Sequence, residues 1–226
     1  NLEAKKRLYQ EKQPVFVAPT EWMLNMFSSS AVGKHSKSLL IHNPLNTAFF
    51  STSEPKSTDS QTIALLIVAA NLGDPIKGIR DVIPALIRAH RSDRLQITMV
   101  GKAPRDIREQ LPVAKYLGPL GVRDLIDVML RHDVMLVPSI QENAGTVVAE
   151  AASQGLPVIA RRVGGMPEMT DYGERGFLFS DQNQLDEILD NLNKVELASM
   201  GKLAKEWAQR FHPDIIAGEY VEKCMN

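Results

Sequence analysis

Short apolar runs alternate with amphipathic stretches along most of this chain. Runs of about four to eight apolar residues indicate buried strands, and apolar positions three or four residues apart indicate helices packed on a sheet. The first such strand is expected at 63–70, with a helix beginning at Asp74 behind it. Further strands are expected at 95–100, 113–117, 134–137, 157–160 and 176–179, and further helices at 105–111, 123–131, 146–154, 182–192, 196–210 and 213–225, with a helical turn at 167–172.

This alternation predicts the class of fold. Strands that alternate with helices are joined by crossover connections, which make neighbouring strands parallel. We therefore expect an α/β domain with a doubly wound, Rossmann-like parallel sheet. A polar stretch at 51–61 is the best candidate for a linker ahead of that domain. Before the linker we expect a polar helix at 1–13, a strand at 15–18, a helix at 21–27 capped by Thr20, and a strand at 39–41.

The helix behind the first strand carries its own start signal. Asp74 suits the N-cap position and Pro75 suits the first helical position. Pro84 lies inside the same helix, where the missing N–H is expected to produce a kink. Its expected apolar face consists of Ile76, Ile79, Ile83, Leu86 and Ile87.

Composition narrows the range of functions. The chain has 226 residues and a formal net charge of −1, which argues against a dedicated nucleic-acid surface. Cys224 is the single cysteine, so no internal disulfide can form and a reducing cytosol fits best. The longest apolar run covers eight residues, 63–70, whereas a membrane-spanning helix needs about 20. No signal peptide is visible, and the start at Asn1 suggests a piece of a longer protein.

Glu142 and Glu150 stand eight positions apart around an expected strand–loop–helix junction. Glu142 falls in the loop after strand 134–137, and Glu150 falls about one to two turns into the next helix. Ligands of open α/β sheets bind at this end of the strands. Two carboxylates there can hold sugar hydroxyls, and the unpaired N–H groups of the helix start favour a phosphate. The alternative is a pair of solvated carboxylates, one placed for the helix dipole.

Other polar residues are expected at the same edge of the sheet. Lys77 could neutralise a phosphate there or be an ordinary surface lysine. Gly164 and Gly165 permit a close backbone approach and could form an anion-binding turn. Arg162 could meet an anion or be a rim charge. The five histidines show no metal-binding spacing, and neither a phosphate-binding P-loop nor a G-x-G-x-x-G motif is present.

Several ordered motifs resemble those of the GT-B glycosyltransferases, especially retaining glycosyltransferase family 4. Glu142 and Glu150 match the family's E-x7-E motif, and the chain continues through 150–160 as EAASQGLPVIA, similar to the family's EAxxxGxPVIA. Residues 164–168 match GGxPE, and Lys77 with Gly78 matches the KG motif. The segments VAPTEW and IHNPL resemble the last pieces before the family's interdomain linker and stand at 17–22 and 41–45.

The resemblance implies that this chain is the C-terminal half of a GT-B fold. Residues 1–50 would be the tail end of the N-terminal acceptor domain, and 51–61 the linker. Residues 62–212 would form the nucleotide-sugar donor-binding domain. Residues 213–226 would form a helix that crosses back toward the N-terminal domain.

The resemblance also implies roles for individual residues. Glu142 and Lys77 would be the catalytic residues, next to the sugar and the diphosphate. Glu150 would accept hydrogen bonds from the ribose, and the backbone near Leu117 would touch the nucleobase. No cofactor and no metal are expected, because protein cations and a helix dipole carry the diphosphate charge. The donor-binding residues would be Asn71, Leu117, Asn143, Ala144, Gly145, Thr146, Glu150 and Arg162.

Two departures from the family pattern matter. Asn71 stands where the family usually has an arginine, so one cation for the leaving group is missing or comes from elsewhere, for example from Arg162. By the same resemblance, the given chain would lack the acceptor half, which in this family carries a histidine near the reacting sugar. We therefore expect this chain alone to bind nucleotide without catalysing transfer, because catalysis needs both domains to close on the donor.

By resemblance, the whole enzyme would move a hexose or hexosamine from a UDP- or GDP-sugar, with retention, to a hydroxyl of a glycan or lipid-linked acceptor. Bacterial surface polysaccharide biosynthesis is the expected context, in the cytoplasm or at the inner membrane face. One alternative is a catalytically inactive nucleotide-binding or regulatory module of GT-B fold. Another is a GT-B sugar-nucleotide epimerase, against which the E-x7-E and KG motifs together argue.

Overall fold

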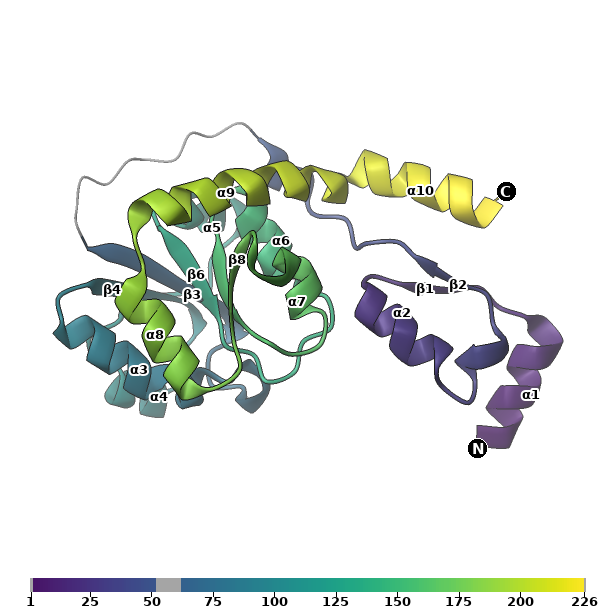
Figure 1. Cartoon of the computed structure of the whole chain (residues 1–226), viewed down its shortest axis with the longest axis horizontal. Coiled ribbons are helices and arrows are strands. Elements are labelled where there is room, and N and C mark those ends of the chain that lie inside the picture. Colours follow the sequence, from purple (N-terminus) through teal and green to yellow (C-terminus); the bar gives the residue numbers. More distant parts are fainter. Residues whose placement is uncertain (1, 52–61, 226) are drawn as a thin grey trace.

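The computed structural model describes residues 2–51 and 62–225, and its centre is a six-stranded parallel sheet (Figure 1). The strand order is β5-β4-β3-β6-β7-β8. The chain therefore enters this sheet in its middle, at β3, and continues through β4 to the edge strand β5. It then returns to β6 and builds the other edge. This is the doubly wound order, and it confirms the predicted fold class. The strands are β3 (Ile63–Asn71), β4 (Leu95–Lys102), β5 (Lys115–Gly118), β6 (Val134–Val137), β7 (Val158–Arg161) and β8 (Gly176–Phe179).

Helices cover both faces of this sheet. Successive side chains of a strand point to opposite faces, so a central strand must be apolar on both. In β3, Leu65 and Ile67 join the core on one face, and Leu66 joins the core on the other. The first face packs against α3 (Ile79–Arg91), α4 (Arg105–Gln110) and α8 (Gln182–Asn191). The second packs against α5 (Val122–Met129), α6 (Thr146–Ser153), α7 (Met166–Met169) and α9 (Lys194–Ala208).

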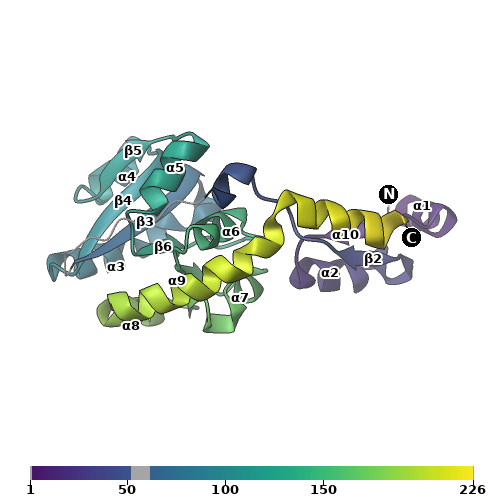
Figure 2. The same ribbon diagram turned by 90° about the horizontal axis from the view of Figure 1, so that it is seen from above.

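A smaller unit lies beside the α/β domain. Strands β1 (Phe16–Ala18) and β2 (Ser38–Leu40) form a parallel pair with α1 (Leu2–Lys12) and α2 (Glu21–Ser28) next to it. The last helix, α10 (Pro213–Met225), leaves the α/β domain and runs back along this pair (Figures 1 and 2). Lys223 Nζ donates to the carbonyl of Leu40 at 3.0 Å, which fixes α10 to β2. Three of the five 3₁₀ segments of the described residues lie in the connections of this unit: Gly33–His35, Thr47–Phe50 and Gln209–Phe211.

The helix expected from Asp74 is interrupted, so that prediction is wrong in detail. Asp74 does cap a turn, accepting from the Ile76 N–H at 2.9 Å, but the turn is a 3₁₀ segment, Pro75–Lys77. Gly78 follows with a positive φ of 63°, and α3 begins only at Ile79. A Cβ on Gly78 would come within 2.2 Å of the Pro138 carbonyl oxygen. The close approach of the two loops therefore breaks the helix, and nothing in the local sequence records that contact.

Most remaining elements follow the sequence pattern, but Ile76, expected on the apolar face of this helix, lies outside α3 and is exposed. Thr20 caps α2 as expected, accepting from the Met23 N–H at 3.2 Å. Helix α3 runs on through Pro84 to Arg91. The helical turn expected at 167–172 is split into α7 and a 3₁₀ segment, Asp171–Gly173. The expected linker 51–61 lies outside the described residues, apart from Ser51. Across residues 2–51 and 62–225, no helix is both long and apolar enough to cross a membrane.

Candidate functional site at the switch point of the sheet

The site forms where the winding direction of the sheet reverses, between β3 and β6. Connections leave these neighbouring strands in opposite directions, so their carboxyl ends border a crevice. Lys77 lies in the connection after β3, and Glu142 lies in the loop after β6. Lys77 Nζ lies 3.1 Å from Glu142 Oε2. The structure therefore brings together the two residues that the sequence predicted as catalytic, although they are 65 positions apart.

The loop that carries Glu142 is held by close backbone contacts. The Ile140 N–H donates to the Ile76 carbonyl at 2.9 Å, which joins this loop to the loop of Lys77. On the other side, a Cβ on Gly164 would lie 1.8 Å from the Glu142 carbonyl oxygen, and Gly164 has a φ of 55°. A Cβ on Gly165 would lie 2.1 Å from the Asn143 carbonyl oxygen. The glycine pair is thus required for loop packing, which was one of its two expected roles.

Helix α6 points its amino terminus into the same crevice. Its N-cap residue is Gly145, with φ 48° and ψ 56°, and no side chain caps the first turn. The N–H groups that begin a helix have no partner within it and carry a partial positive charge, so they suit an anion. Asn143 and Thr146 are exposed on either side of the buried Gly145, and Ala144 is half-buried. The four predicted residues 143–146 therefore form one segment at the start of α6, exposed at Asn143 and at Thr146.

Glu150 lies one turn further along α6 and is half-buried. Burial raises the pKa of this carboxyl above its ordinary value, and no hydrogen bond offsets the effect. A carboxylate removed from water costs free energy unless donors compensate it. Groups perturbed in this way are concentrated at ligand-binding and catalytic sites. Within the described residues, no group donates a hydrogen bond to the Glu150 carboxylate, so its oxygens are available to hydrogen-bond donors of a ligand.

The raised pKa of Glu150 predicts that replacing this carboxylate with a neutral side chain stabilises the fold to an extent that depends on pH. The folded state binds the carboxyl proton of Glu150 more tightly than the unfolded state does. Protonated Glu150 therefore contributes stability below the unfolded-state pKa, and this contribution is lost as pH rises through the folded-state pKa. Glu150→Gln should therefore raise the free energy of unfolding at about pH 8 but hardly change it at about pH 4. Urea denaturation of both proteins at the two pH values measures this. An equal effect at both would contradict a desolvated carboxylate.

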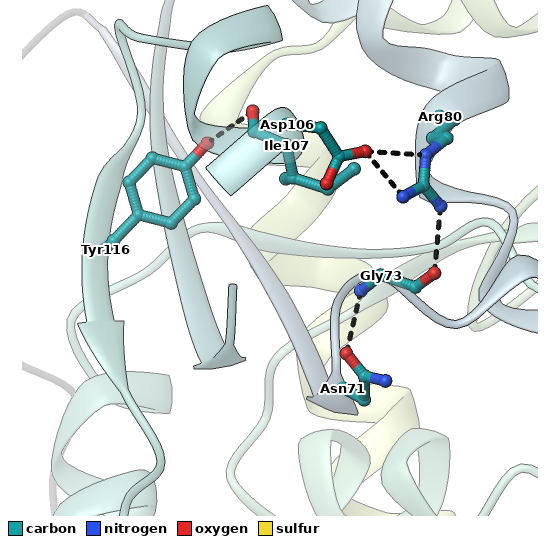
Figure 3. Close-up of polar contacts among 6 residues, drawn as sticks. All are labelled: Asn71, Gly73, Arg80, Asp106, Ile107 and Tyr116. Carbon is teal, nitrogen blue, oxygen red and sulfur yellow. Dashed lines mark hydrogen bonds and ion pairs between the residues drawn. The ribbon is translucent and has the colours of Figure 1, made fainter. Parts of the chain in front are cut away.

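Asn71 sits at the carboxyl end of β3 and carries no charge to the crevice. Its Oδ1 accepts from the Gly73 N–H at 3.0 Å, which shapes the loop after β3 (Figure 3). Arg80 closes that loop from the other side, donating to the Gly73 carbonyl at 2.8 Å and to Asp106 Oδ2 at 2.6 Å. The Arg80 guanidinium holds the pKa of Asp106 below its ordinary value. Asn71 therefore acts here as a loop-forming residue.

Leu117 and Arg162 lie further along the same edge of the sheet. Leu117 is half-buried in β5, at the opposite side of β4 from β3. Arg162 follows β7, is exposed, and donates its backbone N–H to the Phe179 carbonyl at 2.8 Å. By strand order each is two strands from β3, so neither is a direct neighbour of the Lys77 connection. Sequence motifs placed them at the correct edge but could not give these separations.

Two further residues tie the amino-terminal unit to the site, and the sequence did not reveal this role. Thr20 Oγ1 donates to the Asn143 carbonyl at 3.4 Å. Glu168 accepts from the backbone N–H groups of Glu21 and Trp22 at 3.0 and 3.3 Å. Glu168 belongs to a recognisable motif, but its partners lie 146 and 147 positions away. The loop 142–146 thus contacts the N-cap residue of α2, and Glu168 on α7 contacts the first turn of α2.

The ion pair between Lys77 and Glu142 is expected to add little stability. The two side chains retain 36% and 19% of their exposure, and pairs of this kind are worth about 0–1 kcal/mol. A double-mutant cycle of Lys77→Met and Glu142→Gln, read by urea denaturation, should give a coupling energy in that range. A coupling well above about 1 kcal/mol would indicate a structural pair and weaken the case for a functional one.

Across residues 2–51 and 62–225, no group of three or more His, Cys, Asp or Glu side chains could hold a metal ion. The residues at the crevice are instead a lysine, two carboxylates and backbone N–H groups. Such a set can bind an anion beside hydroxyl groups, as in a nucleotide.

Comparison with known proteins identifies the family. Residues 64–195 match the family of glycosyl transferases group 1, and this chain belongs to that family. It is 39% identical over 104 residues to a D-inositol 3-phosphate glycosyltransferase of Saccharomonospora viridis, covering 44% of this chain and 24% of that protein. It is 27% identical over 172 residues to the N-acetyl-alpha-D-glucosaminyl L-malate synthase of Bacillus anthracis, covering 71% and 45%. The chain thus spans less than half the length of these curated relatives.

A solved structure supports the same fold. The chain superposes on Anabaena Alr3699/HepE, crystallised with UDP and glucose, with a TM-score of 0.79. The identity is 21%, and the match covers 100% of this chain and 66% of that one. At this identity the likeness establishes the fold alone. Together with the family match, it confirms the predicted resemblance to the GT-B glycosyltransferases.

Proposed function

We propose that this chain is the donor-binding part of a glycosyltransferase that uses a nucleoside diphosphate sugar. One observation carries the proposal: the half-buried Glu150 carboxylate has no hydrogen-bond donor within the described residues and lies one turn beyond an uncapped helix start. A ribose supplies two hydroxyl donors for such a group, and the attached diphosphate reaches the helix start. Lys77 lies on the other side of the crevice, where it would contact the diphosphate. Its partner Glu142 would contact the sugar.

The domain division follows from this proposal. Residues 62–212 would bind the donor, and residues 1–50 would be the tail end of an acceptor-binding domain. Residues 213–226 would cross back to that domain, which fits the contact between Lys223 and Leu40. Since the two halves of such an enzyme must close around the donor, this chain alone should bind nucleotide and show no transfer.

The finer assignments extend the proposal. We infer transfer with retention to a hydroxyl of a glycan or lipid-linked acceptor, in bacterial surface polysaccharide synthesis on the cytoplasmic side of the membrane. The similar Anabaena protein carries UDP and glucose in its crystal, which makes UDP-glucose a natural first donor to test. The anomeric configuration of the transferred sugar in the product, measured by NMR, decides between retention and inversion.

A binding test separates this proposal from unrelated functions. Calorimetric titration of the chain with UDP, GDP and ADP should show that one of them binds clearly better than the others. Binding of none of the three would overturn the proposal for this chain. The preferred nucleotide would also identify the base, which sequence motifs do not give.

A catalytically inactive module of GT-B fold is the second candidate. The neutral Asn71 favours it, because an expected cation is absent from the end of β3. Both candidates bind nucleotide, so the titration does not separate them. A transfer assay on a protein that includes the acceptor half does: turnover of the sugar nucleotide excludes the inactive module, and tight binding without turnover supports it.

A further inference from the structure

A nucleoside diphosphate brings more negative charge to the crevice than the residues described so far can balance. Lys77 is paired with Glu142, so the two side chains together bring no net positive charge to the diphosphate. Asn71 offers only a neutral amide, and its oxygen is occupied by the Gly73 N–H. Charge-assisted bonds from lysine or arginine are the usual means of holding phosphate oxygens. A further cation is therefore expected near the end of β3, provided that the proposed function is correct.

Two arginines near this edge are already engaged. Arg80 donates to Asp106 and to the Gly73 carbonyl, and this links the loops after β3 and β4 (Figure 3). Arg161 donates to the Pro138 carbonyl at 3.0 Å and to Asp81 at 3.2 Å. Moving either guanidinium to a ligand would break contacts that shape the loops.

Lys102 satisfies the requirement better than any of these. It is the last residue of β4, and its Cα is the register partner of Asn71 on β3. Partnered residues of adjacent strands project from the same face, and the strands lie about 4.8 Å apart. The Lys102 side chain is exposed, and within the described residues its ammonium has no hydrogen-bond acceptor. Arg162, by contrast, follows β7, which is not a neighbour of β3.

The backbone around Lys102 is built to hold this position. A bulge between β3 and β4 brings Lys102 into register with Asn71. Gly101 makes the bulge possible, with a φ of 127° and a site for Cβ only 1.7 Å from the Ala69 carbonyl oxygen. The Lys102 carbonyl then accepts from the Leu72 N–H at 2.9 Å. The lysine is thus anchored at its backbone and free at its ammonium.

We propose that Lys102 binds the diphosphate of the donor and stabilises the charge of the leaving nucleoside diphosphate. In this role it supplies from β4 the cation that Asn71 does not supply from β3. The inference rests on the proposed function, and it assigns a specific chain position to the diphosphate end of the site.

The test compares a nucleoside diphosphate with its monophosphate. Lys102→Met should weaken binding of the diphosphate that the chain prefers, among UDP, GDP and ADP, by about 10-fold or more, since a hydrogen bond to a charged group is worth roughly 1.5–3 kcal/mol. Binding of the corresponding monophosphate should change less. Lys202→Met, at an exposed lysine on α9, is the matched control and should leave both affinities unchanged.

One further variant separates loss of the charge from loss of folding. Lys102→Arg keeps the positive charge and should keep most of the affinity for the diphosphate. Unchanged diphosphate affinity in Lys102→Met would overturn the inference, as would equal losses for the two nucleotides. If the unaltered chain binds no nucleotide, the proposed function itself is wrong, and this result is recognised before any variant is made.

Discussion

Glu150→Ala is expected to weaken binding of the preferred nucleoside diphosphate about 10- to 150-fold, because a hydrogen bond to a charged group is worth roughly 1.5–3 kcal/mol. The loss follows from the surroundings of this carboxylate. It is half-buried, its pKa is raised by burial, and no protein donor compensates it. Ribose hydroxyls would therefore provide hydrogen bonds that the free protein lacks. Isothermal titration of the two proteins measures the difference directly.

A matched carboxylate gives the control for this result. Glu206 lies exposed on α9, and Glu206→Ala should leave the affinity unchanged. The free energy of unfolding of Glu150→Ala should not fall with the affinity, since removing an uncompensated carboxylate relieves a desolvation cost. An affinity for nucleotide equal to that of the unaltered chain would mean that Glu150 does not contact the ligand.

Gly164→Ala is expected to cost roughly 2–4 kcal/mol of stability, through a strained backbone and overpacking together. Gly164 has a φ of 55°, and its Cβ would lie 1.8 Å from the Glu142 carbonyl oxygen. A backbone atom cannot rotate away as a side chain can, so the loop that carries Glu142 must shift. Nucleotide affinity should fall together with stability. Urea denaturation and the same titration measure the two effects.

Gly218 provides the corresponding control within α10. A Cβ there meets no atom within 4 Å, and its φ is not positive. Gly218→Ala should therefore be neutral or stabilising by up to about 1 kcal/mol, as expected for glycine in a helix. Equal destabilisation by both substitutions would show that the close contact at Gly164 is not the cause of the destabilisation by Gly164→Ala.

The sequence predicted the fold well because its apolar pattern is local. Strand β3 is apolar on both faces, which marks a central strand whatever its neighbours are. The break at Gly78 could not be predicted in the same way. Asp74 and Pro75 are sound helix-start residues, and the interruption depends on the carbonyl of Pro138, some 60 positions further along the chain. A tertiary contact here overrides a local preference.

The position of the site residues at one edge of the sheet could be predicted from the sequence. Each strand end faces the same edge, so Lys77 and Glu142 could be placed together from the alternation of strands and helices. Their 3.1 Å separation could not. The contact of Glu168 with α2 and the pairing of Lys102 with Asn71 depend on register and on a bulge. Such features arise only when distant segments are packed together.

The most direct test of the proposed donor site is a crystal structure of this chain with the nucleoside diphosphate that it binds best. We expect ribose hydroxyls within hydrogen-bonding distance of the Glu150 carboxylate, with the diphosphate against the backbone N–H groups that begin α6. A nucleotide bound elsewhere on the chain, with Glu150 left in contact with solvent alone, would contradict it.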